Sequence, residues 1–203
     1  MLIDASSYKN LEILDLIDYI KNLDKVETVI QVAEEMEMRV QRVHEVTDDE
    51  LNQLIRYLEL IAEHTDKIIS AEIAKDNKLS ITHTFNPRGS KAKISLHYGE
   101  LYLLAKAISI KETILCDDES IFHIKIILSG ICDIELDAKR TIEYLYSMYI
   151  ANNISATDFI KYFERLTDRG LLQFRFPAKS IKDKSVTKTL IEFMYQLESR
   201  STR

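Results

Sequence analysis

The chain has 203 residues and 46% of them are hydrophobic, which suits one medium-sized domain with a real core and excludes an intrinsically disordered chain. Its net charge of −6 and pI of about 5.5 disfavour a protein that coats nucleic acid non-specifically, but leave open a nuclease whose acidic site is neutralised by metal ions. No run approaches the ~20 apolar residues of a membrane span, and the first residues lack the pattern of a signal peptide, so we expect a cytoplasmic protein.

Both cysteines, Cys116 and Cys132, lie within apolar stretches. We interpret them as reduced core thiols, the usual state in the cytoplasm. Glycine and proline are scarce, at four and two residues, which predicts long helices with few tight turns.

The first 40 residues predict two strand–helix units. Residues 1–4 form a short apolar strand that ends in a carboxylate, and the apolar spacing from Leu11 to Ile20 predicts a helix after it. Residues 25–30 are rich in β-branched side chains and predict a second strand, which a helix over 31–39 follows.

Residues 41–93 predict helices, an extended segment and the clearest loop of the chain. The segment from Thr47 to Glu50 has the form of a capping box, and residues 66–74 predict a further helix before an extended segment over 79–85. The loop over 86–93 has no acid, so its basic residues are candidates for contacts with substrate phosphates, the alternative being an ordinary solvated loop. These candidates are Arg88, Lys91 and Lys93.

The second half continues the alternation of helices and strands. It predicts a buried helix over 99–108, a strand over 113–116, a helix over 119–129 and a strand over 131–136, then helices over 139–151 and 155–169 and an extended end over 171–176.

Strands that alternate with helices predict an α/β fold with three layers, α/β/α, a mostly parallel central sheet and extra helices. We expect one domain over 1–177, in which 41–93 is an inserted or lengthened region. A basic C-terminal extension with a short helix follows over 178–203.

Several carboxylates are expected to share one crevice. Asp4 closes the first strand, Asp117-Asp118 close a later one, and Glu34-Glu35 and Glu100 lie on helices next to strands. In a parallel sheet, ligands bind beyond the carboxyl ends of the strands. Carboxylates gathered there repel one another unless a proton or a cation neutralises them, and hard divalent ions prefer such oxygens. The pattern predicts metal-assisted hydrolysis of a phosphodiester, although each acid could also be an ordinary helix cap or surface charge.

These segments resemble the PIN-domain family. Leu2-Ile3-Asp4-Ala5-Ser6-Ser7 resembles its opening, and residues 29–36 resemble its strand and helix with an acid three residues after a valine, which selects Glu35 over Glu34. Gly99-Glu100 resembles a helix start of the family. Asp117-Asp118 end an apolar strand as in the family, and the tail over 129–176 is similar to that of a bacterial and archaeal branch of predicted PIN proteins. The resemblance therefore covers about residues 1–40 and 94–177.

The resemblance implies an α/β/α nuclease that binds Mg²⁺ or Mn²⁺, cleaves RNA, and in many members is the toxin paired with a protein antitoxin. It implies that four acids are the catalytic metal ligands, that Asp117 is a further ligand or a supporting acid, and that Ser6 is the hydroxyl that supports the first aspartate. The four acids are Asp4, Glu35, Glu100 and Asp118.

The chain also departs from the family pattern. Lys9 and Asn10 stand where this branch continues with apolar residues, and Cys116 replaces a threonine or leucine. The alternative function is therefore a PIN-like scaffold without catalysis, which binds a protein partner or a second copy through the apolar face of the terminal helix. We interpret His97 and His123 as structural, because no two histidines have the spacing of a metal pair.

Overall fold

The computed structural model describes residues 1–64, 70–74, 78–82 and 96–169. The chain divides into two compact units, Met1–Lys139 and Arg140–Arg203. The expected domain end at residue 177 and the extension over 178–203 lie outside the described residues.

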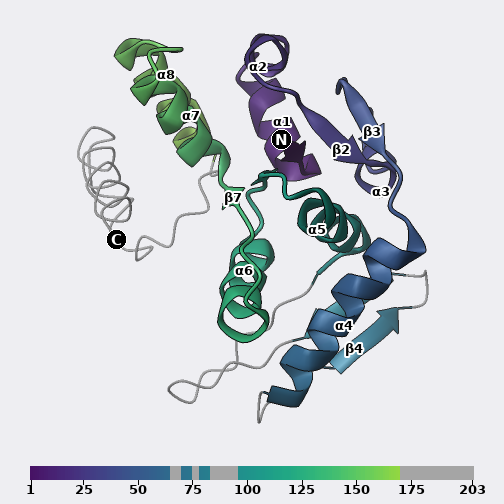
Figure 1. The fold of residues 1–203 in the computed structure, drawn as a ribbon. Coiled ribbons are helices and arrows are strands. Elements are labelled where there is room, and N and C mark those ends of the chain that lie inside the picture. Colours follow the sequence, from purple (N-terminus) through teal and green to yellow (C-terminus); the bar gives the residue numbers. More distant parts are fainter. Residues whose placement is uncertain (65–69, 75–77, 83–95, 170–203) are drawn as a thin grey trace. The chain divides into compact units, whose positions relative to one another are not determined.

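A five-stranded parallel sheet forms the centre of the first unit, and this confirms the predicted α/β class with its parallel sheet (Figure 1). The order is β3-β2-β1-β6-β7, so the chain moves outward from β1 to β3 and then returns to the other side of β1. The neighbours β1 and β6 are thus a topological switch point, where α/β sheets form their binding crevice. The strands are β1 Leu2–Ile3, β2 Glu27–Val29, β3 Arg42–His44, β6 Ile114–Leu115 and β7 Ala138–Lys139.

Helices cover both faces of this sheet. Leu2 belongs to a core cluster that α4, α5 and α6 also supply, whereas Ile3 is fully buried outside that cluster. Because successive side chains of a strand point to opposite faces, both faces are buried, as the three-layer prediction requires. The helices of this unit are α1 Ala5–Ile13, α2 Ile17–Leu23, α3 Ile30–Ala33, α4 Asp48–His64, α5 Tyr98–Ile110 and α6 Glu119–Cys132.

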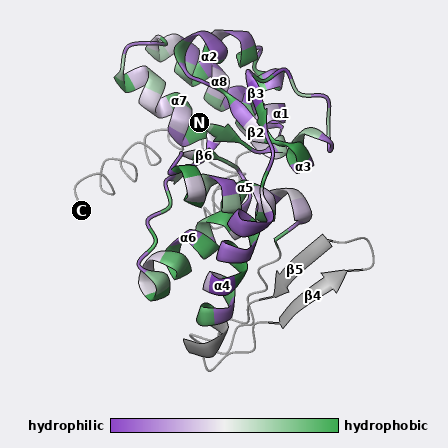
Figure 2. Cartoon of the chain, turned by 45° about the vertical axis from the view of Figure 1, so that its right-hand side comes forward, coloured by the Kyte–Doolittle hydropathy of each residue, from purple (hydrophilic) through white to green (hydrophobic). Residues whose placement is uncertain are grey.

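The helices that pack in the core cluster differ in how much of their surface is apolar (Figure 2). On α4 the buried residues Leu54, Leu58 and Ile61 recur at helical spacing, so one stripe faces the core. On α5 the buried positions include Leu101, Leu103 and adjacent residues on several sides, which confirms the prediction of a buried helix. Each fully buried leucine contributes about 1.5–3 kcal/mol, so α5 is a main source of stability.

The first helix of the chain is interrupted, which the apolar spacing did not predict. α1 ends at Ile13 and α2 begins at Ile17, with Asp15 between them at a φ of 60°. A residue in this left-handed region cannot continue a right-handed helix, so the chain turns there.

The helix predicted over 66–74 was wrong. The structure has β4, Ser70–Ala74, paired antiparallel with β5, Lys78–Thr82, so the pairing of backbones overrides the helical pattern. The helix predicted over 31–39 is shorter, since α3 ends at Ala33. β3, Arg42–His44, was not predicted, because its parallel partner β2 lies 15 residues earlier and leaves no local signal.

The strand predicted over 131–136 was also wrong. α6 continues through Cys132 and ends at Asp133, whose φ of 55° is left-handed and whose N–H donates to Leu128 O. The apolar residues before Asp133 are therefore the last turn of a helix, and the strand is β7, Ala138–Lys139.

The second unit contains a pair of helices that the sequence predicted. They are α7, Thr141–Ile150, and α8, Ala156–Asp168, and Ser155 caps α8. Phe159 stacks on Tyr149 with ring centroids 5.6 Å apart. Among the helices of the described residues, none has the length and apolar character that a bilayer crossing demands.

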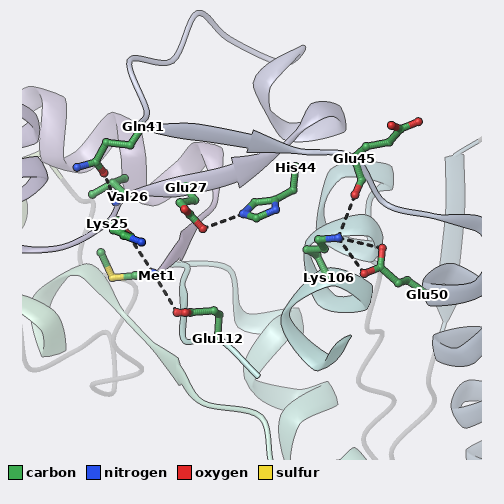
Figure 3. A network of polar contacts seen from close by, with 10 residues as sticks. All are labelled: Met1, Lys25, Val26, Glu27, Gln41, His44, Glu45, Glu50, Lys106 and Glu112. Carbon is green, nitrogen blue, oxygen red and sulfur yellow. Dashed lines mark hydrogen bonds and ion pairs between the residues drawn. The ribbon is translucent and has the colours of Figure 1, made fainter. Parts of the chain in front are cut away.

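A polar network ties α4 to α5, and a second pair joins two strands (Figure 3). Lys106 on α5 donates to Glu50 Oε1 at 2.8 Å and to the backbone oxygen of Glu45 at 3.1 Å. On β3 and β2, His44 Nε2 lies 2.8 Å from Glu27 Oε2. Burial would raise the pKa of Glu50, but hydrogen bonds from Lys106 and other donors outweigh it and hold this pKa at about 2.

We expect Lys106→Met to lower the free energy of unfolding by about 1–3 kcal/mol at neutral pH, because Glu50 loses its cationic donor. The pKa of Glu50 lies below its ordinary 4.5, so its contribution is present above pH 4.5 and is lost as the pH falls toward 2. The difference in the free energy of unfolding between wild type and variant should therefore shrink as the pH falls from 4.5 toward 2. Urea denaturation followed by circular dichroism measures it, with the exposed Lys9→Met as control. A gap that does not change with pH would contradict the assignment.

Candidate functional site

A cavity of about 630 Å³ lies at the switch point of the sheet. The residues after β1 and β6 supply one part of its wall, and α3 and the start of α5 supply the rest. It therefore gathers the four acids that the sequence placed together. The lining residues are Asp4, Ala5, Ser6, Gln31, Glu34, Glu35, His97, Tyr98, Glu100 and Asp118.

Asp4 follows β1 and caps α1. Its Oδ2 accepts hydrogen bonds from the backbone N–H of Ser6 at 3.0 Å and from the Ser6 hydroxyl at 2.5 Å. The same hydroxyl oxygen accepts from the backbone N–H of Asp117 at 3.3 Å. Ser6 therefore orients the Asp4 carboxylate and joins the ends of β1 and β6, the supporting role that the resemblance implies.

Glu100 lies on the first turn of α5, and the side chain is only 6% exposed. Its Oε2 accepts the backbone N–H of His97 at 2.7 Å, which fixes the carboxyl at the helix start. Burial chiefly, and the negative charges of Asp118 and Asp4, raise the pKa of Glu100 to about 9. The acids are thus close enough to oppose each other's ionisation.

Asp118 follows β6 and caps α6. Its Oδ1 accepts the backbone N–H of Ser120 at 2.7 Å, and its own N–H donates to Cys116 Sγ at 3.3 Å. After burial, the negative charge of Asp118 is the largest cause of the raised pKa of Glu100. Burial, and the nearby Asp4, raise the pKa of the Cys116 thiol, so it remains a neutral thiol beneath the site.

Glu35 stands beyond the end of α3 and is exposed, unlike Asp4 and Glu100. Its carboxylate lies against Gly99 on α5, where an added Cβ would overlap Glu35 Oε1. Glycine at this position is therefore what lets the fourth acid approach the others. Glu34, which the resemblance set aside, also lines the cavity.

Asp117 is oriented differently from its neighbour. It is buried but does not line the cavity, and its Oδ2 accepts from the Ser7 hydroxyl at 2.9 Å and from Asn10 Nδ2 at 2.7 Å. The structure thus gives it a supporting position between β6 and α1. It also gives a structural role to the polar side chain of Asn10.

Besides Glu34 and the small Ala5, three polar or aromatic residues of the lining were not predicted as site residues. Gln31 precedes Glu35 by four positions, and His97 and Tyr98 directly precede Gly99-Glu100. Their closeness to predicted acids on the same elements was the available signal. The predicted substrate contacts Arg88, Lys91 and Lys93 lie outside the described residues.

The chemistry of the donor set fits a hard divalent cation, because five carboxylates, Glu34 included, line one cavity. In the described part of the chain, however, no three Asp, Glu, His or Cys side chains are already arranged to hold a metal ion. Burial and the negative charges of Asp118 and Asp4 favour the protonated form of Glu100, since carboxylates this close repel one another when ionised. A bound Mg²⁺ or Mn²⁺ would neutralise this repulsion.

Comparisons of the chain with protein-family models, curated proteins and solved structures found no match. The PIN resemblance therefore rests on the motifs of the sequence.

We expect Asn10→Leu to lower the free energy of unfolding by about 1–3 kcal/mol, because the buried Asp117 carboxylate loses a donor. Thermal and urea denaturation measure the loss. Asn22→Leu is the matched control, since the Asn22 amide donates to a backbone oxygen at the surface of α2. Equal stability of the two variants would contradict a supporting role for Asn10.

We expect Glu100→Gln to be more stable than wild type in metal-free buffer, by about 1–3 kcal/mol at neutral pH. The pKa of Glu100 rises from 4.5 unfolded to about 9 folded, so the wild type loses stability as the pH rises through that window. A glutamine keeps the acceptor for His97 and cannot ionise. Denaturation across pH with EDTA tests this, and a variant advantage that fails to grow with pH would count against it.

Proposed function

We propose that this chain is a metal-dependent endoribonuclease that hydrolyses RNA phosphodiester bonds in its acidic cavity. The carrying observation is that Asp4, Glu35, Glu100 and Asp118 line one cavity at the switch point of a parallel sheet. The raised pKa of Glu100 supports the proposal, because such a cluster is costly for the fold and is found where proteins hold cations or move protons.

Mg²⁺ or Mn²⁺, when bound, would activate a water molecule and neutralise charge on the phosphate. The residues of the chain would hold the carboxylate ligands of this ion in place. Asp4, Glu100 and Asp118 each have one carboxylate oxygen held by a backbone N–H, which limits their rotation. Glu35, the exposed acid, would complete the ligand set from the part of the cavity wall that lies just beyond the end of α3.

The choice of RNA and the toxin role rest on the resemblance to PIN domains, whereas the cytoplasmic location rests on the sequence pattern and the apolar setting of the two cysteines. A toxin of this kind would act with a protein antitoxin encoded beside it. Binding of a second copy of the chain belongs to the alternative proposal, the PIN-like scaffold without catalysis.

We expect Asp118→Asn and Asp4→Asn each to lower cleavage by about 100-fold or more, because each removes a charged ligand. Asparagine caps helices as well as aspartate does, so the folds of α1 and α6 should persist. The measurement is cleavage of a mixed pool of single-stranded and structured RNA with Mn²⁺ or Mg²⁺, with EDTA in a parallel sample. Asp49→Asn, an exposed acid at the start of α4, is the matched control.

Two results would overturn the nuclease. Cleavage that survives both asparagine variants would place the activity elsewhere or in a contaminant. A folded wild-type protein that cuts neither RNA nor DNA with either metal would favour the PIN-like scaffold, to be tested by isolating a partner from cells with the intact chain.

A further inference from the structure

The cavity wall between α3 and α5 differs from the rest of the site in its chemistry. Beside the acids it carries an aromatic ring, Tyr98, and a neutral amide, Gln31. Neither can be explained as a metal ligand of the usual carboxylate kind. Any substrate whose phosphate lies against the acids also presents a sugar and a base, and those groups must contact the remaining wall.

The ring of Tyr98 is held in place by its neighbours, as a platform for stacking requires. It is the first residue of α5 and remains partly exposed. Its ring lies 4.6 Å from that of Tyr102, centroid to centroid, at 52°. Interaction with Tyr98, ahead of burial, raises the pKa of Tyr102 to about 12. A ring fixed on one side by a neighbour loses little conformational freedom when a base stacks on it.

Gln31 has a polar group without a partner. Its side-chain oxygen Oε1 is buried and accepts no hydrogen bond, and it is the one such atom among the residues that the structure describes. A buried acceptor without a donor is unfavourable. Rotation of the partly exposed side chain toward the cavity breaks no hydrogen bond of that oxygen, so a donor on a ligand would be accepted at little cost.

We propose that Tyr98 and Gln31 form a nucleobase subsite, in which Tyr98 stacks on a base of a single-stranded nucleic acid and the Gln31 amide binds the edge of that base. An aromatic face combined with an amide is the chemistry by which proteins hold unpaired bases. The subsite rests on the proposed function and adds its substrate class, a single strand whose base can leave its stack. It also lets an acidic protein hold its substrate by means other than positive charge.

The test compares the binding of two ligands, one with bases and one without, by wild type and by variants of the protein. One ligand is a short fluorescent single-stranded RNA of mixed sequence, and the other is an abasic ribose-phosphate oligomer of the same length and charge. Dissociation constants are measured by fluorescence anisotropy with Mg²⁺, and gels confirm that the oligomers stay intact. Because the two ligands have the same phosphates, only the base-dependent part of binding differs between them.

We expect Tyr98→Leu to weaken binding of the RNA about tenfold and to leave binding of the abasic oligomer unchanged. Gln31→Met should act in the same direction with a smaller effect. Tyr19→Leu, which changes a 40% exposed tyrosine on α2 outside the cavity lining, and Gln53→Met on α4 should bind both ligands like wild type. Melting curves confirm that the variants are folded.

The subsite is overturned if Tyr98→Leu weakens both ligands equally or neither of them, or if wild type binds both with the same affinity. Such a result would not contradict the proposed nuclease function if the protein still cleaves the RNA pool. Base-dependent binding that Tyr98→Leu removes, without any cleavage by wild type, would instead support the subsite and reject the nuclease.

Discussion

The parallel pairing of β1 with β6 is the interaction on which the site depends. Leu2 pairs with Ile114 and Ile3 with Leu115, and the N–H of Asp4 donates to Leu115 O at 3.0 Å. This pairing brings the carboxyl ends of two distant strands together, so residues separated by more than a hundred positions lie at one edge. Side-chain hydrogen bonds from α1 to Asp117 then fix the junction. The crevice is therefore a product of strand order rather than of any single loop.

Three of the four acids stand at helix starts, and this placement gives each of them two roles. As caps, Asp4, Glu100 and Asp118 satisfy backbone N–H groups that would otherwise lack partners. The positive end of each helix dipole also moderates the repulsion within the cluster. The raised pKa of Glu100 shows that this compensation is incomplete. The fold thus retains an unfavourable cluster where an ordinary core would exclude one, which is typical of sites whose chemistry matters more than stability.

Sequence alone could predict those parts of the fold that local signals specify. The strand-end acids Asp4 and Asp118 were found because an apolar strand, a carboxylate and a helix follow one another within a few residues. The interrupted helix at Asp15, the short β3 and the β4–β5 pair were missed, because each depends on a backbone angle or on a partner elsewhere in the chain. The bond between Asn10 and Asp117 spans 107 positions and was beyond any pattern of spacing. Gln31 and Tyr98 were missed because both are neutral, and the spacing of charged residues gives no signal for them.

Gly99 gives the site an unusual vulnerability. The space beside α5 that Glu35 occupies exists because residue 99 has no side chain, and a single methyl group would meet both Glu35 and Val32. The end of a glutamate side chain can move aside, so such a change would keep all the acids in the sequence but shift the Glu35 carboxylate. An intact set of carboxylates in the sequence is therefore not sufficient to conserve the geometry of this cavity. The residue at the position of Gly99 has to be counted with them, because it limits where the Glu35 carboxylate can lie.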